Sequence, residues 1–329
     1  MSSMKPLVIQ TESLDPEPAA WLAERCELVV ISPDEASFAD QARNAQGLLV
    51  RTYTNVNSDF LTDLPNLKVV GRAGVGVDNI DLPACEERGI RVVYTPESNT
   101  QSVVEYVTCL LCDGLRPRIE LEGIVSRSEW SSLRSTVCAE KQMNELTLGI
   151  LGLGRIGRRV AEVARAIGFK VIYHDLLNIP EHDRHGAIPV NLDELLQQSD
   201  VLTIHIDGRP SNHGFLDRKK INLLRDHAFL INASRGFVID EDSLAEWLTA
   251  HPGAQASLDV HAREPVDRDN PLLLVKNARL LPHLASRTRT GLNNMSWVVR
   301  DVWRVISGEE PVHDAVRDAR QWNHRMPKK

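Results

Sequence analysis

The chain has 329 residues, of which 42% are hydrophobic and 25% are charged, so it is long enough for two globular domains, each with its own core. The formal net charge of -7 comes from interspersed acids and bases without a basic run, which disfavours a nucleic acid or an anionic membrane as partner. The opening MSSMKPLVIQ has no cationic start followed by an apolar core, and no later segment approaches about 18 uninterrupted apolar residues. We therefore expect a soluble, cytoplasmic protein whose partner is a small diffusible molecule.

The cysteines do not form a recognisable framework. Their number is five, which is odd, and they are scattered as Cys26, Cys85, Cys109, Cys112 and Cys138. Such a set predicts reduced thiols rather than disulfides. Cys109 and Cys112 have CxxC spacing but lie in a helix-like run, QSVVEYVTCLLCDGL, with no second pair or nearby histidine. We expect them to belong to a helix core, and we expect no metal site.

The first part of the chain, residues 6–94, alternates short apolar runs with amphipathic segments. The apolar runs are PLVI, ELVVI, GLLV, LKVV and RVVY. Strands separated by helix-length segments predict a parallel sheet covered on both faces. A long helical pattern follows from Gln101 to about Ser126, and Pro117 should kink or break it.

The alternation then starts again and forms a second doubly wound α/β unit. Its strand-like runs are TLGILG, KVIYHD, DVLTIH, AFLIN, ASLDV and ARLLP. Residues 287–308 are predicted to form one more helix, which leads the chain back to the first domain. The polar tail 312–329 has too little apolar content for another domain.

A glycine-rich loop lies between the first run of the second unit and the helix after it. Gly152, Gly154 and Gly157 have the spacing that lets a backbone approach a pyrophosphate at a helix N-terminus. The next strand ends in Asp175, 18 residues after Gly157, where a carboxylate can bind a ribose diol. Leu176 follows instead of a basic residue, which disfavours a 2′-phosphate. The pattern predicts NAD as cofactor.

Further segments complete a resemblance that covers nearly the whole chain. They are GRAGVGVDNIDL (71–82), SNTQSVVEYV (98–107), GLGRIG (152–157), LINASRG (230–236), SLDVHAREP (257–265) and LLPHLAS (280–286). Together they resemble the D-isomer specific 2-hydroxyacid dehydrogenase family. The resemblance implies a Rossmann cofactor domain, residues 99–289, inserted into a flavodoxin-like substrate domain, residues 1–98 plus 290–329. It also implies a homodimer formed by the cofactor domains.

The same resemblance assigns three catalytic residues. Arg235 matches the arginine that binds the substrate carboxylate and polarises the reacting carbonyl, a task that suits a guanidinium fork. His283 matches the acid/base histidine, and Glu264 matches the carboxylate that orients it. The chemistry is consistent, because alcohol oxidation needs a base near neutral pH and a carboxylate favours the imidazolium that forms.

Other family positions are expected to bind cofactor or substrate. Asp259 matches an aspartate near the nicotinamide amide. The remaining cofactor-binding candidates are Val104, Gly152, Gly154, Arg155, Ile156, Gly157, Asp175, Ala233, Ser234, Arg235, His283 and Ser286. The substrate-binding candidates are Arg51, Val75, Gly76, Asn99 and Arg235; the backbone N–H groups of Val75 and Gly76 match the loop that receives the substrate carboxylate. HIDGRPSN at 205–212 departs from the family pattern, as do Val104 and Ala285.

The resemblance implies hydride transfer between nicotinamide and C2 of a 2-hydroxy or 2-keto acid. Two positions favour 3-phosphoglycerate or its keto product as substrate. Arg51 matches a substrate-domain arginine of phosphoglycerate dehydrogenases, and a phosphorylated acid needs positive charge beyond Arg235. Leu133 stands where family glyoxylate and hydroxypyruvate reductases can place a partner-subunit tryptophan. Tyr53 and the acidic net charge argue against a phosphorylated acid, so glyoxylate or hydroxypyruvate is the alternative. An NAD-sensing scaffold like the C-terminal binding protein corepressors is a rival, whereas Glu264 disfavours a formate dehydrogenase, which typically has glutamine there.

Overall fold

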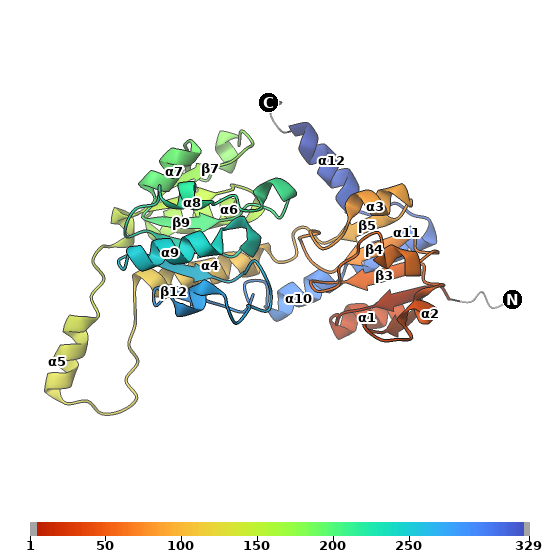
Figure 1. Ribbon diagram of the computed structural model, residues 1–329, viewed down its shortest axis with the longest axis horizontal. Helices are drawn as coiled ribbons and strands as arrows, with labels where there is room; N and C mark the ends of the chain where they lie inside the picture. Colours follow the sequence, from red (N-terminus) through yellow and green to blue (C-terminus); the bar gives the residue numbers. More distant parts are fainter. Residues whose placement is uncertain (1–4, 326–329) are drawn as a thin grey trace. The chain divides into compact units, whose positions relative to one another are not determined.

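The structure, a computed structural model, describes residues 5–325, and its internal contacts divide the chain into two compact units (Figure 1). Unit 1 consists of the chain up to Thr100 together with the chain from Ser286 onward. Unit 2 is Gln101–Ala285. The chain therefore leaves unit 1 once, completes unit 2 and returns once.

Unit 1 is built on a parallel sheet with the strand order β2-β1-β3-β4-β5, the order of flavodoxin-like folds. Its strands are β1 (Leu7–Gln10), β2 (Glu27–Val30), β3 (Gly47–Val50), β4 (Val69–Arg72) and β5 (Arg91–Tyr94). Its helices are α1 (Pro16–Ala23), α2 (Phe38–Ala42), α3 (Leu82–Glu87), α10 (Arg289–Ser296), α11 (Val299–Ser307) and α12 (Ala315–Arg325). β3 is buried throughout, as expected for a central strand covered on both faces.

Helix α11 covers one face of this sheet. Val299 and Val302 belong to the same buried cluster as Val8, Leu49 and Val69 from the strands. The contact is close, since a Cβ atom on Gly71 of β4 would lie 2.4 Å from a methyl group of Val302. A segment from the C-terminal end of the sequence thus completes the core of unit 1.

Unit 2 is built on a parallel sheet with the order β12-β11-β10-β9-β6-β7-β8, in which the strand order reverses between β6 and β9. Its strands are β6 (Thr147–Leu151), β7 (Lys170–His174), β8 (Ile188–Pro189), β9 (Val201–Ile204), β10 (Phe229–Asn232), β11 (Gln255–Leu258) and β12 (Ala278–Leu280). Its helices are α4 (Thr100–Leu115, beginning at the boundary), α5 (Arg127–Thr136), α6 (Arg155–Ile167), α7 (Leu192–Gln198), α8 (Arg218–Ile221) and α9 (Glu241–Ala250). This is the Rossmann arrangement, with β12 added at one edge.

Two hydrophobic cores lie on the two faces of this sheet. One includes Val107 of α4 and Val160 of α6, and the other includes Leu195 of α7 and Leu244 of α9. The amphipathic pattern of the sequence is thus satisfied on both faces. Among the described residues, no helix has the length and apolar character needed to cross a membrane.

Two helix predictions had different outcomes. The break at Pro117 is confirmed, because α4 ends at Leu115. The single helix expected at 287–308 is wrong: the segment forms α10 and α11. The chain turns at Trp297, whose backbone N–H bonds to the carbonyls of Asn293 and Asn294 and whose indole N–H donates to the side-chain oxygen of Asn293 at 3.0 Å. These bonds close the first helix.

Helix α5 stands apart from the rest of unit 2 at the end of a long loop (Figure 1). It starts with a capping box, in which Ser126 and Glu129 each accept a hydrogen bond from the other's backbone N–H group. None of the residues of α5 is buried. The segment before and within this helix exposes several large apolar side chains, namely Ile119, Leu121, Ile124 and Trp130.

Candidate active site

The glycine loop of unit 2 joins β6 to α6 at the point where the strand order reverses. Gly152 has φ +93°, and a Cβ atom there would lie 2.8 Å from the carbonyl oxygen of His205. A Cβ atom on Gly157 would lie 2.2 Å from the carbonyl oxygen of Gly152. Packing therefore requires the first and third glycines to lack a side chain.

Gly154 differs, because a Cβ atom there would meet nothing within 4 Å. It is the N-cap of α6 and supplies no side-chain cap, so the first N–H groups of this helix are available to an anion. Arg155 and Ile156 are the first two residues of the helix. The loop thus fits the pyrophosphate of a dinucleotide.

Asp175 follows β7 and faces the glycine loop. One carboxylate oxygen accepts a hydrogen bond from Leu153 N at 2.7 Å, and the other accepts from Leu177 N at 2.8 Å. The carboxylate is held at the carboxyl end of the strand, beside the loop, while Leu176 is exposed. An acid fixed in this place suits a ribose diol, and together these residues fit NAD.

The segment 205–212, which departs from the family pattern, is held by hydrogen bonds between its own residues. Arg209 Nε donates to Asp207 Oδ1 at 2.6 Å, and the side-chain amide of Asn212 donates to the carbonyl of Asp207 at 2.9 Å. His205 is a partly buried residue, and desolvation of its imidazole lowers the pKa to about 3; its Nε2 lies 3.0 Å from the hydroxyl of Thr203. The imidazole is therefore neutral, and the backbone carbonyl of the same residue lies beside Gly152 of the glycine loop.

His283 and Glu264 form a pair in unit 2. His283 Nδ1 lies 2.7 Å from Glu264 Oε2, and both side chains are partly exposed. Burial raises the pKa of Glu264, but the hydrogen bond and the charge of His283 outweigh this effect and hold it below its ordinary value. Because the carboxylate only accepts, Nδ1 carries a proton and Nε2 is left for another partner.

Asp259 fixes the turn that carries His283. Its carboxylate is buried and accepts hydrogen bonds from Leu284 N and Ala285 N, both at 2.8 Å. His283 has φ +53°, a left-handed conformation that is uncommon outside glycine. Burial raises the pKa of Asp259 despite these two donors. Asp259 therefore holds the backbone just after His283, whereas Glu264 bonds to the His283 side chain.

Arg235 lies in the loop that follows β10. The side-chain amide of Asn232 donates to the carbonyl of Arg235 at 2.9 Å, and the side-chain oxygen of Asn232 accepts from Ser234 N at 3.0 Å. Arg235 Nη1 donates to the carbonyl of Ser234 at 2.8 Å. Ala233 is the other residue of this turn and packs against a hydrophobic core. Asn232 thus organises the backbone from which the guanidinium projects.

The predicted substrate residues Arg51, Val75, Gly76 and Asn99 belong to unit 1. Arg51 follows β3, whereas Val75 and Gly76 follow β4 after Gly74, which has φ +154°. Asn99 precedes α4, and within residues 5–325 its buried Oδ1 has no hydrogen-bond partner. Both strand ends lie at the carboxyl edge of a parallel sheet, where ligand sites of such folds occur.

The loop 51–54 is held by Glu12, which follows β1. The Glu12 carboxylate accepts hydrogen bonds from the four successive N–H groups of this loop, with distances of 2.9 Å to Arg51 N and 3.0 Å to Thr54 N. Burial raises the pKa of Glu12, but these donors hold it below its ordinary value. Asn79 donates to the carbonyls of Arg51 and Thr54, so the loop is fixed from both sides.

The remaining predicted residues are distributed over both units. Val104 is buried in α4 of unit 2, and Ser286 is the first residue of unit 1 after the return of the chain. The structure thus brings together Glu264 with His283 and Asp175 with the glycine loop. It assigns the substrate-binding candidates other than Arg235 to the other unit.

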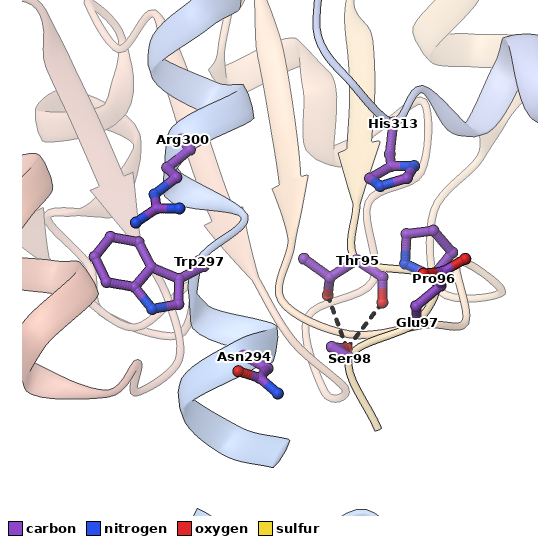
Figure 2. Close-up of a pocket in the computed structure, with 8 residues that line it drawn as sticks. All are labelled: Thr95, Pro96, Glu97, Ser98, Asn294, Trp297, Arg300 and His313. Atoms are coloured by element: carbon purple, nitrogen blue, oxygen red, sulfur yellow. Dashed lines mark hydrogen bonds between the residues drawn. The ribbon is translucent and has the colours of Figure 1, made fainter. Parts of the chain in front are cut away.

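A pocket of about 340 Å³ lies within unit 1, and Figure 2 shows the residues that line it. Its lining comes from three parts of the chain, namely Thr95–Ser98, the segment of Asn294, Trp297 and Arg300 in and between α10 and α11, and His313. Arg300 lies over the indole ring of Trp297 at 3.9 Å from its centroid. None of the predicted catalytic or cofactor-binding residues lines this pocket, so we do not regard it as the catalytic site.

Comparison with known proteins agrees with this geometry. The family model described as "D-isomer specific 2-hydroxyacid dehydrogenase, NAD binding domain" matches residues 109–285. A glyoxylate reductase from Aeropyrum pernix is 32% identical over 294 residues, which cover 87% of this chain and 88% of the relative. The chain belongs to the D-isomer specific 2-hydroxyacid dehydrogenase family, and the match to an NAD-binding domain identifies its cofactor as NAD.

Other similar proteins carry different names. A D-3-phosphoglycerate dehydrogenase from Archaeoglobus fulgidus is 34% identical over 273 residues, which cover 82% of this chain and 51% of the relative. The chain therefore spans about half the length of that relative. The crystal structure of a glyoxylate reductase from Paecilomyes thermophila is similar, with a TM-score of 0.81 and 25% sequence identity. The matched region covers 95% of this chain and 99% of the glyoxylate reductase chain. The fold is thus shared by relatives with different named activities.

Sequence reasoning missed two residues of this neighbourhood. His261 lies between Asp259 and Glu264, and its Nε2 is 2.8 Å from the carbonyl oxygen of Leu281. Arg287 lies four residues after His283, and its positive charge acts on Arg51. The first could have been noticed as a further titratable side chain in SLDVHAREP, but the second depends on the approach of two charges from distant parts of the sequence.

Proposed function

We propose that the protein is an NAD-dependent D-2-hydroxyacid dehydrogenase. The observation that carries the proposal is the hydrogen bond of 2.7 Å between His283 Nδ1 and Glu264 Oε2, on the same unit as the glycine loop that fits NAD. NAD, when bound, supplies the hydride acceptor or donor. The residues of the chain then have to bind the acid, orient it and exchange one proton.

His283 exchanges that proton through Nε2, because Nδ1 is committed to Glu264. In oxidation Nε2 takes the hydroxyl proton, and the Glu264 carboxylate stabilises the imidazolium that forms. In reduction the same proton returns to the carbonyl oxygen. Arg235 binds the substrate carboxylate and polarises the reacting carbonyl, with its backbone held by Asn232.

We further propose that residues 1–98 and 290–329 form the substrate domain and residues 99–289 the cofactor domain. The strand order of unit 2 supports the second assignment, since this order is that of dinucleotide-binding domains. Val75 and Gly76 then belong to the substrate domain, where N–H groups of the 75–76 loop receive the carboxylate, and Asn99 is the first residue of the cofactor domain. Asp259 and Ser286 lie toward the nicotinamide in this proposal.

The substrate that we propose is 3-phosphoglycerate or its keto product, 3-phosphohydroxypyruvate. Burial and the neighbouring positive charge of Arg287 lower the pKa of Arg51. Within the described part of the chain, neither guanidinium forms an ion pair with a carboxylate, and Arg51 Nη1 donates only to the carbonyl of Ser13, at 3.2 Å. The charge of Glu12 acts in the opposite direction, but its carboxylate is engaged by backbone N–H groups of the loop. Two neighbouring cations that form no ion pair favour an anionic group, such as a phosphate, between them.

Arg287 also answers the objection from Tyr53. Tyr53 stands where a second arginine is found in some phosphoglycerate dehydrogenases, and it is 74% exposed. Arg287, although it comes from a distant part of the sequence, supplies a second positive charge to the same loop. The alternative substrates glyoxylate and hydroxypyruvate have no distal phosphate and would leave both charges unmatched.

Turnover tests both levels of the proposal. Purified protein with NADH should reduce a 2-keto acid, and absence of turnover across a panel would favour the NAD-sensing scaffold instead. Arg51→Ala and Arg287→Ala should each lower kcat/KM for 3-phosphohydroxypyruvate by about 10- to 100-fold, the value of one hydrogen bond to a charged group, and barely affect glyoxylate. Arg289→Ala, an exposed arginine two residues on, is the control. Brisk reduction of glyoxylate without use of the phosphorylated acid would reject the substrate but not the enzyme class.

We also propose a homodimer in which the segment carrying α5 contacts a second copy. Ile124 is fully exposed and Trp130 is 49% exposed, and a separate helix with such side chains gains stability when it is covered. Sedimentation should show a dimer, and Ile124→Asp should weaken it.

Two further proposals concern surroundings. The free state of Cys26, Cys85, Cys109, Cys112 and Cys138 supports a reducing compartment, which we propose is the cytoplasm. The net charge of -7 supports the absence of nucleic-acid and membrane partners.

A further inference from the structure

His261 is a buried histidine that the proposed reaction does not use. Its residue is 5% exposed, and its Nε2 lies 2.8 Å from the carbonyl oxygen of Leu281. A carbonyl oxygen only accepts, so Nε2 carries the proton. Nδ1 is also buried, and it has no hydrogen-bond partner within residues 5–325. An unmatched buried nitrogen costs about 1 to 3 kcal/mol, a penalty that an apolar residue would avoid.

The accepting carbonyl lies two residues before His283. The N–H group of Leu281 donates to the carbonyl of Leu258 at 2.8 Å, and the next residue, Pro282, has no N–H group to donate. Among the residues that the structure describes, the His261 imidazole therefore supplies the last hydrogen bond to the backbone before His283, which adopts a left-handed conformation. After His283, the turn is held by Asp259.

The backbone of His261 contacts the other two predicted catalytic segments. Its N–H group donates to Glu264 Oε1 at 3.1 Å, and the second oxygen of the same carboxylate binds His283. On the other side, a Cβ atom on Gly236 would lie 1.8 Å from the carbonyl carbon of His261, so the residue after Arg235 packs directly on this backbone. His261 is thus the point where the segments of Arg235, Glu264 and His283 meet.

We propose that His261 is a positioning residue for the Glu264–His283 pair: its imidazole N–H fixes the approach of the chain to His283, while its backbone N–H fixes Glu264. The role rests on the proposed dehydrogenase function for its consequence in catalysis. It does not require His261 to touch substrate or cofactor. The side chain matters through one donor group, and this makes the role separable from simple filling of the core.

The test compares His261→Phe, which keeps a ring but removes the donor, with His261→Gln, which keeps an N–H donor. His261→Phe should lower kcat by about tenfold or more and leave the Kd for NADH unchanged. The pH above which 2-keto acid reduction declines should move to a lower value. The reason is that a misplaced His283 makes a weaker hydrogen bond to Glu264, and the carboxylate then stabilises the His283 imidazolium less. His261→Gln should recover most of kcat and of the pH profile.

A matched control is His251→Phe. His251 also belongs to unit 2 and also bonds to a backbone carbonyl through its ring, with Nδ1 2.7 Å from the oxygen of Trp247, but at the end of α9. This variant should lose a comparable amount of stability without changing kcat or the pH profile. An equal effect of both histidine variants on kcat would show a general loss of packing and overturn the proposal.

A measurement without turnover separates this inference from the function. In ¹⁵N-labelled protein with NADH, the downfield proton on His283 Nδ1, assigned by its loss in His283→Ala, should shift or broaden in His261→Phe. An unchanged resonance together with unchanged kcat would overturn the proposal, even if the enzyme class is right. If no keto acid is reduced, the resonance still decides. If His261→Phe does not fold, His261→Asn replaces it, because its side-chain amide is one methylene shorter than that of glutamine and should not reach the carbonyl of Leu281. Equal kcat values for the Asn and Gln variants would then overturn the proposal.

Discussion

Replacement of Asp175 provides a sensitive test of the cofactor site. The carboxylate is held between Leu153 N at 2.7 Å and Leu177 N at 2.8 Å, so it cannot turn away from the ribose without losing both bonds. A 2′-phosphate at about 4 Å from it would be repelled by about 4 kcal/mol at an effective dielectric constant of about 20. Partial exposure reduces this value, and we expect NADH to be preferred to NADPH by about 100- to 1000-fold in kcat/KM.

Asp175→Asn removes the charge but keeps the shape and one acceptor. The preference should fall to about tenfold or less, mainly because NADPH improves, while kcat/KM with NADH falls by about tenfold for the loss of a charged hydrogen bond. Steady-state rates with both cofactors measure this, and Asp226→Asn, whose side chain is 88% exposed, is the control. Equal use of both cofactors by the unaltered protein, or full discrimination by Asp175→Asn, would refute the reasoning.

Three other predictions follow from the hydrogen bonds of the two units. His283→Ala should lower kcat by about 10² to 10⁴, the usual contribution of a positioned acid/base group, with NADH affinity unchanged by titration calorimetry; near-normal turnover would mean another proton donor. Glu264 has a lowered pKa, so its stabilising contribution should be present above its ordinary value of 4.5 and be lost as pH falls below it; Glu264→Gln should therefore reduce the acid sensitivity of unfolding and also shift the pH–rate profile. Glu12→Gln should lower the free energy of unfolding by about 2 kcal/mol in urea titrations, because four N–H groups lose a charged acceptor, whereas Glu24→Gln, with a 74% exposed side chain, should not.

The fold could be predicted largely from the sequence, because its strands are short apolar runs and its helices are amphipathic. The strand-like runs around Leu48 and Ile150, for example, are β3 and β6 of the structure. β8 could not be predicted, since it consists of Ile188–Pro189 at a sheet edge and has no periodicity to detect. The break near Trp297 depends on side-chain hydrogen bonds of Asn293, which a hydrophobic pattern does not report.

The candidate site residues could be predicted from the sequence, but the residues that hold them in place could not. Motifs gave Glu264 and His283, and the structure adds the bond of 2.7 Å between them. They did not give Glu12 or His261, whose partners lie far along the chain or bind through backbone groups. The role of such residues becomes clear only when the fold brings segments together, because each bonds to a carbonyl or N–H group that any residue could provide.

The return of the chain to unit 1 has a consequence for the order of events during synthesis. All of unit 2 emerges from the ribosome before α11, which covers Val8, Leu49 and Val69 of the first sheet. Until residue 307 has been made, that face of the sheet lacks α11 and is covered only in part, by Leu22 of α1, and Arg91 also lacks Asp314, its partner at 2.5 Å. The inserted unit can thus complete its core first, while the N-terminal segment, although it is translated earliest, is among the last to reach its native state. A nascent chain stopped before Val299 should therefore contain a protease-resistant unit 2 and an unprotected N-terminal segment.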